Sequence, residues 1–195
     1  MSKLFWKDIW DSKGNSDSED LLYLDGYEHL DIDFNSVSIC DKIIQIMDIQ
    51  KGDRILEVGC GAGYLARELQ KYDYIGVDYS KPLVEKHKHL FPKHAVQVAQ
   101  AGSLPFEENS FDKVFCFGVV QYFPDREYAD LALSEMKRVA RHSIFLGDLK
   151  TRPTRKEHFV YPKDELADSG FEFSECLYLA SDVERFNAFC KKDVS

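Results

Sequence analysis

Three glycines within five residues constrain most strongly what this chain can fold into. The stretch "ILEVGCGAGYLARELQ", from Ile55 to Gln70, places these glycines after an apolar run and before a helical pattern. Glycine adopts positive φ readily and lets another group approach the backbone closely, so a glycine-rich turn between a strand and a helix is typical of ligand-binding loops. We therefore expect a ligand to lie against this loop.

Strands and helices alternate along the chain after this loop. Short β-branched or aromatic runs predict strands at 54–59, 74–78, 95–99, 113–118 and 143–148, and helical patterns occupy about 63–72, 81–90 and 127–140. Alternation of this kind indicates βαβ units and a parallel sheet.

The two ends of the chain depart from this rhythm. Near the C-terminus, a helix ending at Gly170 is followed by two strand-like runs, 171–180 and 184–192, with no helix between them. Near the N-terminus, apolar spacing predicts a helix over 35–49 that begins at an Asn35 or Ser36 cap. The whole pattern predicts an α/β fold: a doubly wound, mostly parallel, seven-stranded sheet with a C-terminal antiparallel hairpin, in three αβα layers.

Length and charge limit the number of domains and the partners. A chain of 195 residues is enough for one well-filled core, so we expect a single domain over 1–195. The formal net charge of −9 disfavours a nucleic-acid partner. We expect no membrane association, because no apolar run is long enough to span a bilayer and the start of the chain lacks the pattern of a secretory signal.

Cysteine usage favours a cytoplasmic protein without a metal site. The five cysteines are scattered and lack the paired spacing of metal ligands, so they are interpreted as reduced thiols. Cys60, inside the glycine loop, is interpreted as a small filler residue rather than a nucleophile. The oligomeric state is left open between a monomer and a homodimer.

The glycine loop fits neither of two phosphate-binding patterns. The dinucleotide fingerprint requires Gly or Ala three residues after the second glycine, where this chain has Tyr64, and a P-loop requires a Lys that is missing here. What remains is Glu57, two residues before the first glycine, and Asp78, placed about twenty residues beyond the loop, where an acid can accept hydrogen bonds from a ribose. A cationic ligand with an amino-acid moiety suits Glu57 better than a pyrophosphate.

These motifs make the chain resemble the class I S-adenosylmethionine-dependent methyltransferases. "LEVGCGAG" resembles the first motif of that family, and "GVDYS" resembles its ribose-binding strand end. "AGSLPFEENSFDKVFCFGVVQYFPD" is similar to the family's loop and fourth strand. The resemblance is strong from Lys51 to about Leu149, and it implies S-adenosylmethionine as the cofactor.

The resemblance also implies roles for individual residues. Glu57 would organise the glycine loop around the methionine end of the cofactor, Asp78 would hold both ribose hydroxyls, and Tyr79 would lie against the adenine. The other implied cofactor residues are Gly59, Cys60, Gly61 and Gly63 of the loop, Gln100, Ala101 and Gly102 beside the adenine, and Phe117 and Gly118 near the sulfonium. Many relatives carry Asp where Gln100 stands, but an amide oxygen can still accept from the adenine amino group.

Methyl transfer depends mainly on positioning, and it needs a base only when the acceptor arrives protonated. The candidates for that base are His29, Tyr27, Tyr122 and Asp148. The candidates for contact with the acceptor are Trp10, Gln121, Tyr122 and Asp148. Three further histidines lie on or just after a polar helix and are expected to be solvated: His87, His89 and His94.

The N-terminal segment, residues 1–34, is unusually aromatic. It carries Trp6, Trp10, Tyr23 and Tyr27, and we expect it to close over the cofactor as a lid and to help form the acceptor pocket. The alternative is that these rings only pack an N-terminal helix onto the sheet.

Three functions remain open on this basis. The leading hypothesis is methyl transfer to an oxygen or nitrogen of a small metabolite, such as a sugar or an amine, because little sequence exists beyond the minimal fold. The second is a catalytically silent cofactor-binding protein that regulates a partner. The third is a protein or nucleic-acid methyltransferase, although the fourth strand is followed by "GVVQ" rather than an "NPPY"-like tetrad.

Overall fold

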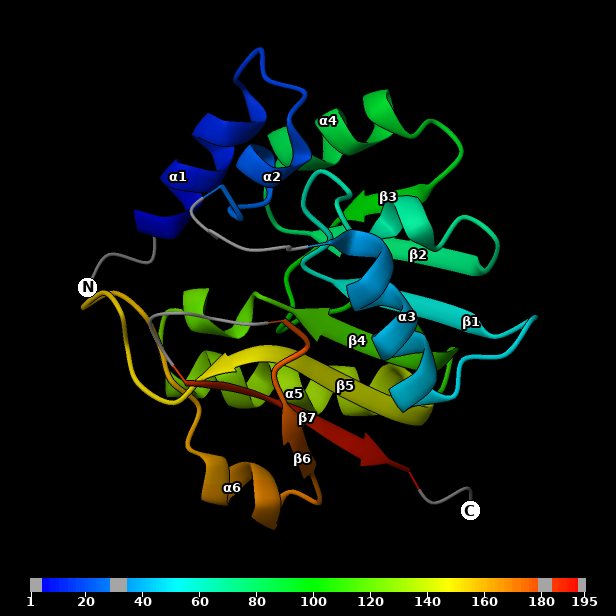
Figure 1. Cartoon of the computed structure of the whole chain (residues 1–195), viewed down its shortest axis with the longest axis vertical. Helices are drawn as coiled ribbons and strands as arrows, with labels where there is room; N and C mark the ends of the chain where they lie inside the picture. The colour runs from blue at the N-terminus through cyan, green and yellow to red at the C-terminus, as the bar shows by residue number, and fades with distance from the viewer. Residues whose placement is uncertain (1–4, 29–34, 179–183, 193–195) are drawn as a thin grey trace.

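The computed structural model describes residues 5–28, 35–178 and 184–192. In this part of the chain, seven strands form one mixed sheet in the order β3-β2-β1-β4-β5-β7-β6 (Figure 1). The strands are β1 Arg54–Val58, β2 Asp73–Asp78, β3 Ala95–Val98, β4 Phe111–Phe117, β5 Ala140–Lys150, β6 Glu172–Glu175 and β7 Arg185–Lys191. The first five pair in parallel, and β7 is antiparallel to both β5 and β6. The predicted sheet and its C-terminal hairpin are confirmed.

Helices cover both faces of this sheet. They are α1 Phe5–Gly14, α2 Leu21–Leu24, α3 Ser36–Met47, α4 Lys81–Leu90, α5 Arg126–Val139 and α6 Lys163–Asp168, with short 3-10 turns η1 Ala66–Glu68 and η2 Val120–Tyr122. Alternate residues of β1 face opposite layers: Ile55 belongs to the core that α3 covers, and Leu56 belongs to the core that α5 covers. The three-layer αβα arrangement is therefore confirmed.

The N-terminal ends of the two core helices follow from side-chain caps. The Asn35 side chain accepts hydrogen bonds from the backbone N–H groups of Val37 and Ser38, which confirms the cap predicted for α3. The Asp125 side chain accepts from the N–H of Tyr128 and begins α5 in the same way. Both helices thus start at positions that local sequence specifies.

The helix predicted over 63–72 is wrong. Only Ala66–Glu68 forms a 3-10 turn, because the N–H groups of Glu68, Leu69 and Tyr72 each bond to a carbonyl three residues back. Every residue from Gly61 to Ala66 is buried, whereas an amphipathic helix buries only one face. Packing on all sides at this point overrides the good helix propensity of the sequence.

Helix α1 packs on α4 beside the carboxyl end of β2 (Figure 1). Gly14 ends α1 there, and a β-carbon at this position would lie 2.5 Å from the backbone nitrogen of Leu83. Only glycine permits so close an approach. Across the described residues, no helix combines the length and apolarity that a membrane crossing requires.

Candidate functional site

The carboxyl ends of β1, β2 and β4 meet the N-terminal segment around two adjoining cavities. The inner cavity, of about 60 Å³, lies between residues 59–61 of the glycine loop and the side chains of Trp10, Asp25 and Tyr27. The outer cavity, of about 270 Å³, lies between the end of β2 and the segments 99–101 and 119–124. The residues shared by both are Gly59, Asp78, Tyr79, Val119 and Tyr122.

Asp78, the last residue of β2, holds the glycine loop in place. Its Oδ2 accepts a hydrogen bond from the N–H of Gly61 at 3.0 Å, and its Oδ1 accepts from the N–H of Ser80 at 2.8 Å. The N–H of Tyr79 also bonds to the carboxylate, and because an ionised carboxylate offers about four acceptor positions, capacity for a ligand hydroxyl remains. This placement is compatible with the ribose contact predicted for Asp78, which stays a prediction.

Three carboxyl groups, those of Asp25, Glu57 and Asp78, line the inner cavity. Loss of solvation is the main reason that their pKa values rise, to about 7 for Asp25, about 8 for Glu57 and about 6 for Asp78. The Tyr74 hydroxyl donates to Glu57 Oε2 at 2.7 Å and partly offsets the effect on that group. No Lys, Arg or His is among the described residues that line this cavity. A ligand with positive charge would complement it.

Two glycines that line the inner cavity allow neighbouring side chains to pack closely on the backbone. Gly59 has φ of +84°, and a β-carbon there would lie 2.3 Å from Val119 Cγ2. Gly118 has φ of +71°, and a β-carbon there would lie 2.8 Å from the Tyr27 hydroxyl. Both positions require glycine for conformation as well as for space.

His87 is buried beneath the glycine loop, so the prediction that it is solvated is wrong. Its Nδ1 lies 3.1 Å from the Gly61 carbonyl oxygen, and its Nε2 lies 2.9 Å from Nδ1 of His94. Burial lowers the pKa of His87 to about 4, so the ring is neutral at pH 7. The reason is helical geometry: His87 comes four residues after Leu83 and shares the buried face of α4. His94 is half-buried, and His89 is exposed as predicted.

Some of the residues predicted to lie beside the adenine line the outer cavity, and others only pack against neighbouring side chains. Gln100 and Ala101 line the outer cavity, whereas Gly102 lines neither cavity and lies against the Tyr128 ring. Of the loop residues, Cys60 lines the inner cavity. Gly63 lines neither, and a β-carbon there would lie 3.0 Å from the His87 ring.

The residues predicted near the sulfonium and the acceptor also divide. Trp10, Tyr27, Phe117, Gly118 and Tyr122 line the inner cavity. Gln121 and Asp148 line neither cavity. The Gln121 amide donates to the Gly118 carbonyl at 2.7 Å. The Asp148 carboxylate accepts from Arg185 Nη1 at 2.7 Å and from the Tyr178 hydroxyl at 2.6 Å. His29 lies outside the described residues.

The candidate bases that are described carry their protons tightly or are already engaged. Burial raises the pKa of Tyr27 well above its ordinary value, with repulsion from Asp148 adding to the effect, and burial also raises the pKa of Tyr122. Both phenols therefore stay protonated at pH 7 and can orient an acceptor. Asp148 is held in its ion pair with Arg185, which makes it an anchor for the end of β5 rather than a free base.

Sequence reasoning did not single out several cavity residues. They are Asp25, Tyr64, Leu65 and Leu83 in the inner cavity, and Lys7, Pro124 and Tyr128 among those in the outer cavity. For Asp25 a weak signal existed, since Asp-Gly after the short apolar run "LLYL" indicates a turn. Nothing local, however, shows that this turn faces a loop that begins more than thirty residues later.

A model of the methyltransferase domain family matches residues 56–145, which include β1, the glycine loop and Asp78. The chain contains a class I S-adenosylmethionine-dependent methyltransferase domain. The match begins in β1 and ends in β5, so α1, α2 and α3 lie outside it. The cofactor of this domain is S-adenosylmethionine.

Curated relatives with methyltransferase names match this chain, and a solved structure shares its fold. The chain is 35% identical over 130 residues to a probable methyltransferase, ltbC, of Aspergillus luteorubrus, covering 59% of this chain and 44% of that protein. It is 31% identical over 94 residues to probable tRNA methyltransferase 9B of Mus musculus, covering 48% of this chain and 21% of that protein. The chain thus spans less than half the length of these relatives. A phosphoethanolamine N-methyltransferase of Haemonchus contortus shares the fold, with a TM-score of 0.71 at 15% identity over 100% of this chain and 50% of that one.

The residues present in the methyltransferase domain fit this cofactor. Gly59, Gly61 and Gly118 line the inner cavity, and the acids of this cavity complement a sulfonium and an ammonium group. Asp78 lines both cavities, which suits a ribose that joins an adenine to a methionine chain. When bound, the cofactor supplies the activated methyl group.

The cofactor should stabilise the methyltransferase domain more as the pH rises from about 6 to about 7.5. Carboxyls with raised pKa values contribute stability below their unfolded values near pH 4, and that contribution is lost as the pH rises through 6 to 8. A bound cation favours the ionised forms and offsets this loss. Thermal unfolding with and without S-adenosylmethionine measures the difference. S-adenosylhomocysteine, which lacks the sulfonium, should show a weaker dependence, and a pH-independent shift for both ligands would contradict the expectation.

Proposed function

We propose that this protein transfers a methyl group from S-adenosylmethionine to an oxygen or nitrogen of a small metabolite, such as a sugar or an amine. The observation that carries the proposal is an aromatic cover made by segments outside the family match. The Trp6 ring stacks on the His158 ring with 5.2 Å between ring centroids, and it packs edge-on against the Tyr122 ring with 4.7 Å between centroids. The Trp6 indole N–H donates to the Glu157 carbonyl oxygen at 3.2 Å. A helix before the domain and a loop after β5 thus meet beside the cavities, which favours a small acceptor.

Such a cover suits the chemistry of methyl transfer. In-line displacement at a sulfonium depends on holding the acceptor at the correct angle and keeping water out. Tyr122 lines both cavities, and the Trp10 ring meets its edge at 5.0 Å. In this proposal, Tyr27 and Tyr122 orient the acceptor through their protonated hydroxyls, and His29 stays a candidate base.

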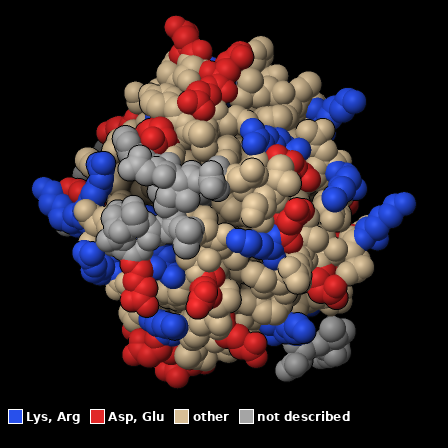
Figure 2. All heavy atoms as spheres, viewed as in Figure 1, with Lys and Arg blue, Asp and Glu red and all other residues tan. Residues whose placement is uncertain are grey.

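The surface charge gives less support to a polyanionic substrate. On the face seen in Figure 2, lysine and arginine side chains alternate with aspartate and glutamate and form no continuous basic patch. The net charge of −9 points the same way. A tRNA substrate is the second candidate, because some matching relatives are named as probable tRNA methyltransferases.

Turnover with a panel of acceptors tests the proposed function. Purified protein is incubated with radiolabelled S-adenosylmethionine and with hydroxyl-bearing metabolites, amines, protein extract or bulk tRNA. Label should enter the small-molecule fraction. Label in tRNA or in protein would favour the other acceptor classes, and binding without turnover on any acceptor would favour the regulatory alternative.

We also propose that residues 1–34 act as a lid. The inner cavity of about 60 Å³, which would take the methionine end of the cofactor, is much smaller than the adjoining outer cavity of about 270 Å³, and this supports movement of the segment when the cofactor enters. Amide exchange at residues 5–28 should slow several-fold when S-adenosylmethionine is added, while exchange in β4 stays unchanged. Equal protection with and without cofactor would sink the lid proposal.

A further inference from the structure

We propose that Asp25 is a cofactor-binding residue whose carboxylate recognises the positively charged methionine end of S-adenosylmethionine while it braces the glycine loop. Asp25 lies in the N-terminal segment, outside the residues that the family model matches. The inference rests on the cofactor and is independent of the identity of the methyl acceptor.

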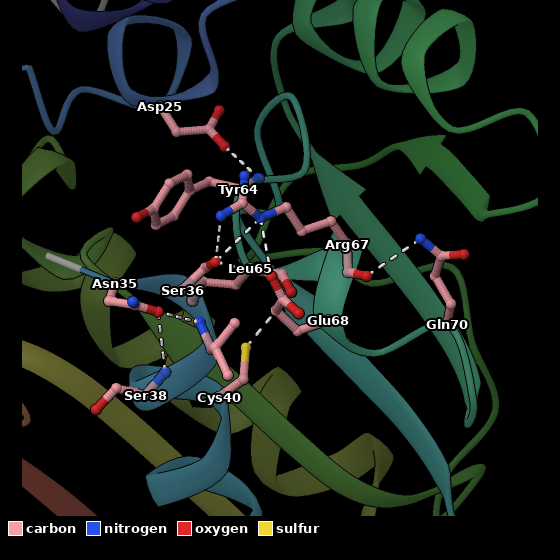
Figure 3. A network of polar contacts seen from close by, with 11 residues as sticks. Asp25, Asn35, Ser36, Ser38, Cys40, Tyr64, Leu65, Arg67, Glu68 and Gln70 are labelled. Atoms are coloured by element: carbon pink, nitrogen blue, oxygen red, sulfur yellow. Dashed lines mark hydrogen bonds and ion pairs between the residues drawn. The ribbon is translucent and has the colours of Figure 1, made fainter.

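The Asp25 carboxylate contacts the glycine loop directly. Its Oδ1 accepts a hydrogen bond from the N–H of Ala62 at 2.6 Å, and its Oδ2 accepts from the N–H of Tyr64 at 2.8 Å. Figure 3 shows the side chain pointing down onto the backbone at Tyr64. A β-carbon on Gly61 would lie 2.2 Å from Oδ1, so the glycine is required where the acid meets the loop.

Local structure holds Asp25 in this position. It follows the short helix α2 and precedes Gly26, whose φ is +82°. The N–H of Gly26 bonds to the Tyr23 carbonyl at 3.2 Å, and the N–H of Tyr27 bonds to the Leu22 carbonyl at 2.7 Å, which together form a Schellman C-cap. Leu24, beside the acid, is fully buried in a cluster with Trp10 and Ala62. The side chain is therefore directed by a defined turn that is packed against the loop it contacts.

The acceptor capacity that Asp25 retains has a natural partner in the cofactor. Three loop N–H groups bond to the carboxylate, those of Ala62, Gly63 and Tyr64, and a carboxylate offers about four positions, so roughly one remains. The side chain lines the inner cavity, where no described lining residue is a Lys, Arg or His. The family resemblance implies that the glycine loop lies against the methionine end of the cofactor, whose ammonium group carries the matching charge.

The same contacts could instead mean that Asp25 blocks the cofactor site, as a plug that occupies loop N–H groups. The N–H groups of Ala62 and Tyr64 could hold the methionine carboxylate, and Asp25 would then have to leave before the cofactor binds. The two roles predict opposite effects of removing the charge, because loss of a binding group weakens affinity and loss of a plug strengthens it.

Calorimetric titration of Asp25→Asn with three ligands tests the proposal. S-adenosylmethionine and S-adenosylhomocysteine carry the ammonium group, whereas 5′-methylthioadenosine has the same nucleoside without the amino-acid moiety. We expect the dissociation constants of the first two to rise about ten-fold or more, as for the loss of a hydrogen bond to a charged group, and that of the third to change less than about two-fold. Asp17→Asn, an exposed acid of the same segment, is the matched control and should bind all three ligands as the wild type does.

Two outcomes would overturn the proposal. An equal loss for all three ligands would mean that Asp25 only braces the loop, because Gly61 of that loop also bonds to Asp78 at the ribose position. Unchanged or tighter binding of the first two ligands would identify Asp25 as a plug or as inert. If Asp25→Asn does not fold, Asp25→Glu keeps the charge on a longer side chain, and it should still bind S-adenosylmethionine more tightly than 5′-methylthioadenosine. Loss of that preference would be equally decisive against recognition by charge.

Discussion

Replacing Asp78 with alanine is expected to weaken S-adenosylmethionine binding by roughly ten- to a hundred-fold, because the loss of hydrogen bonds to a charged acceptor costs about 1.5–3 kcal/mol. The variant should also unfold at a lower temperature than the wild type. The side chain accepts from the N–H groups of Gly61 and Ser80, which then lose a buried partner. Calorimetric titration and thermal unfolding measure the two effects separately.

Asp78→Asn separates these contributions. The amide keeps one carbonyl oxygen as an acceptor and removes the charge, so stability should recover in part while the affinity stays reduced. An unaltered affinity in Asp78→Ala, with the protein folded, would place the ribose elsewhere in the cavities.

The second large effect is expected for Gly59→Ala. A β-carbon would lie 2.3 Å from Val119 Cγ2 while the backbone keeps a φ of +84°. Left-handed backbone costs about 1–2 kcal/mol for a residue with a side chain, and overpacking adds typically 1–3 kcal/mol. Because Gly59 lines both cavities, cofactor binding should fall below detection at micromolar protein even where the variant is folded.

Gly52→Ala is the matched control for the backbone alone. Gly52 has φ of +101°, and a β-carbon there meets nothing within 4 Å. It should lose only the conformational part, about 1–2 kcal/mol, and bind the cofactor normally. Chemical denaturation of both variants isolates the steric contribution at Gly59 as their difference. Equal losses of stability and normal binding in both would show that Val119 moves aside without consequence.

Local signals account for the part of the site that the sequence predicted. A strand, three glycines and an acid at the end of the next strand are read from short windows, because parallel strands bring their carboxyl ends to one edge of the sheet. Glu57, Gly59, Gly61, Asp78 and Tyr79 accordingly line one cavity. Their individual roles toward the cofactor stay predictions.

The wrong predictions share a cause. The segment 63–72 has the composition of a helix, but it is buried on several sides and forms only a 3-10 turn. The run "KPLVEKHKHL" looks polar, but His87 lies on the apolar face of α4 and is buried in the core. Propensity is a weak prior when a segment is enclosed by its neighbours. The surroundings of a residue decide in such places, and a single sequence does not contain them.

The sequence by itself determined the fold class, because the periodicity of strands and helices is a local property, and its resemblance to the methyltransferases implied the cofactor. Only the tertiary structure decided what covers the cofactor site. Asp25 meets Ala62 and Tyr64, and Trp6 meets Tyr122 and His158, through contacts between segments far apart in the chain. No repeating pattern marks such pairs, since each depends on how α1, α2 and the loop after β5 pack on the finished sheet.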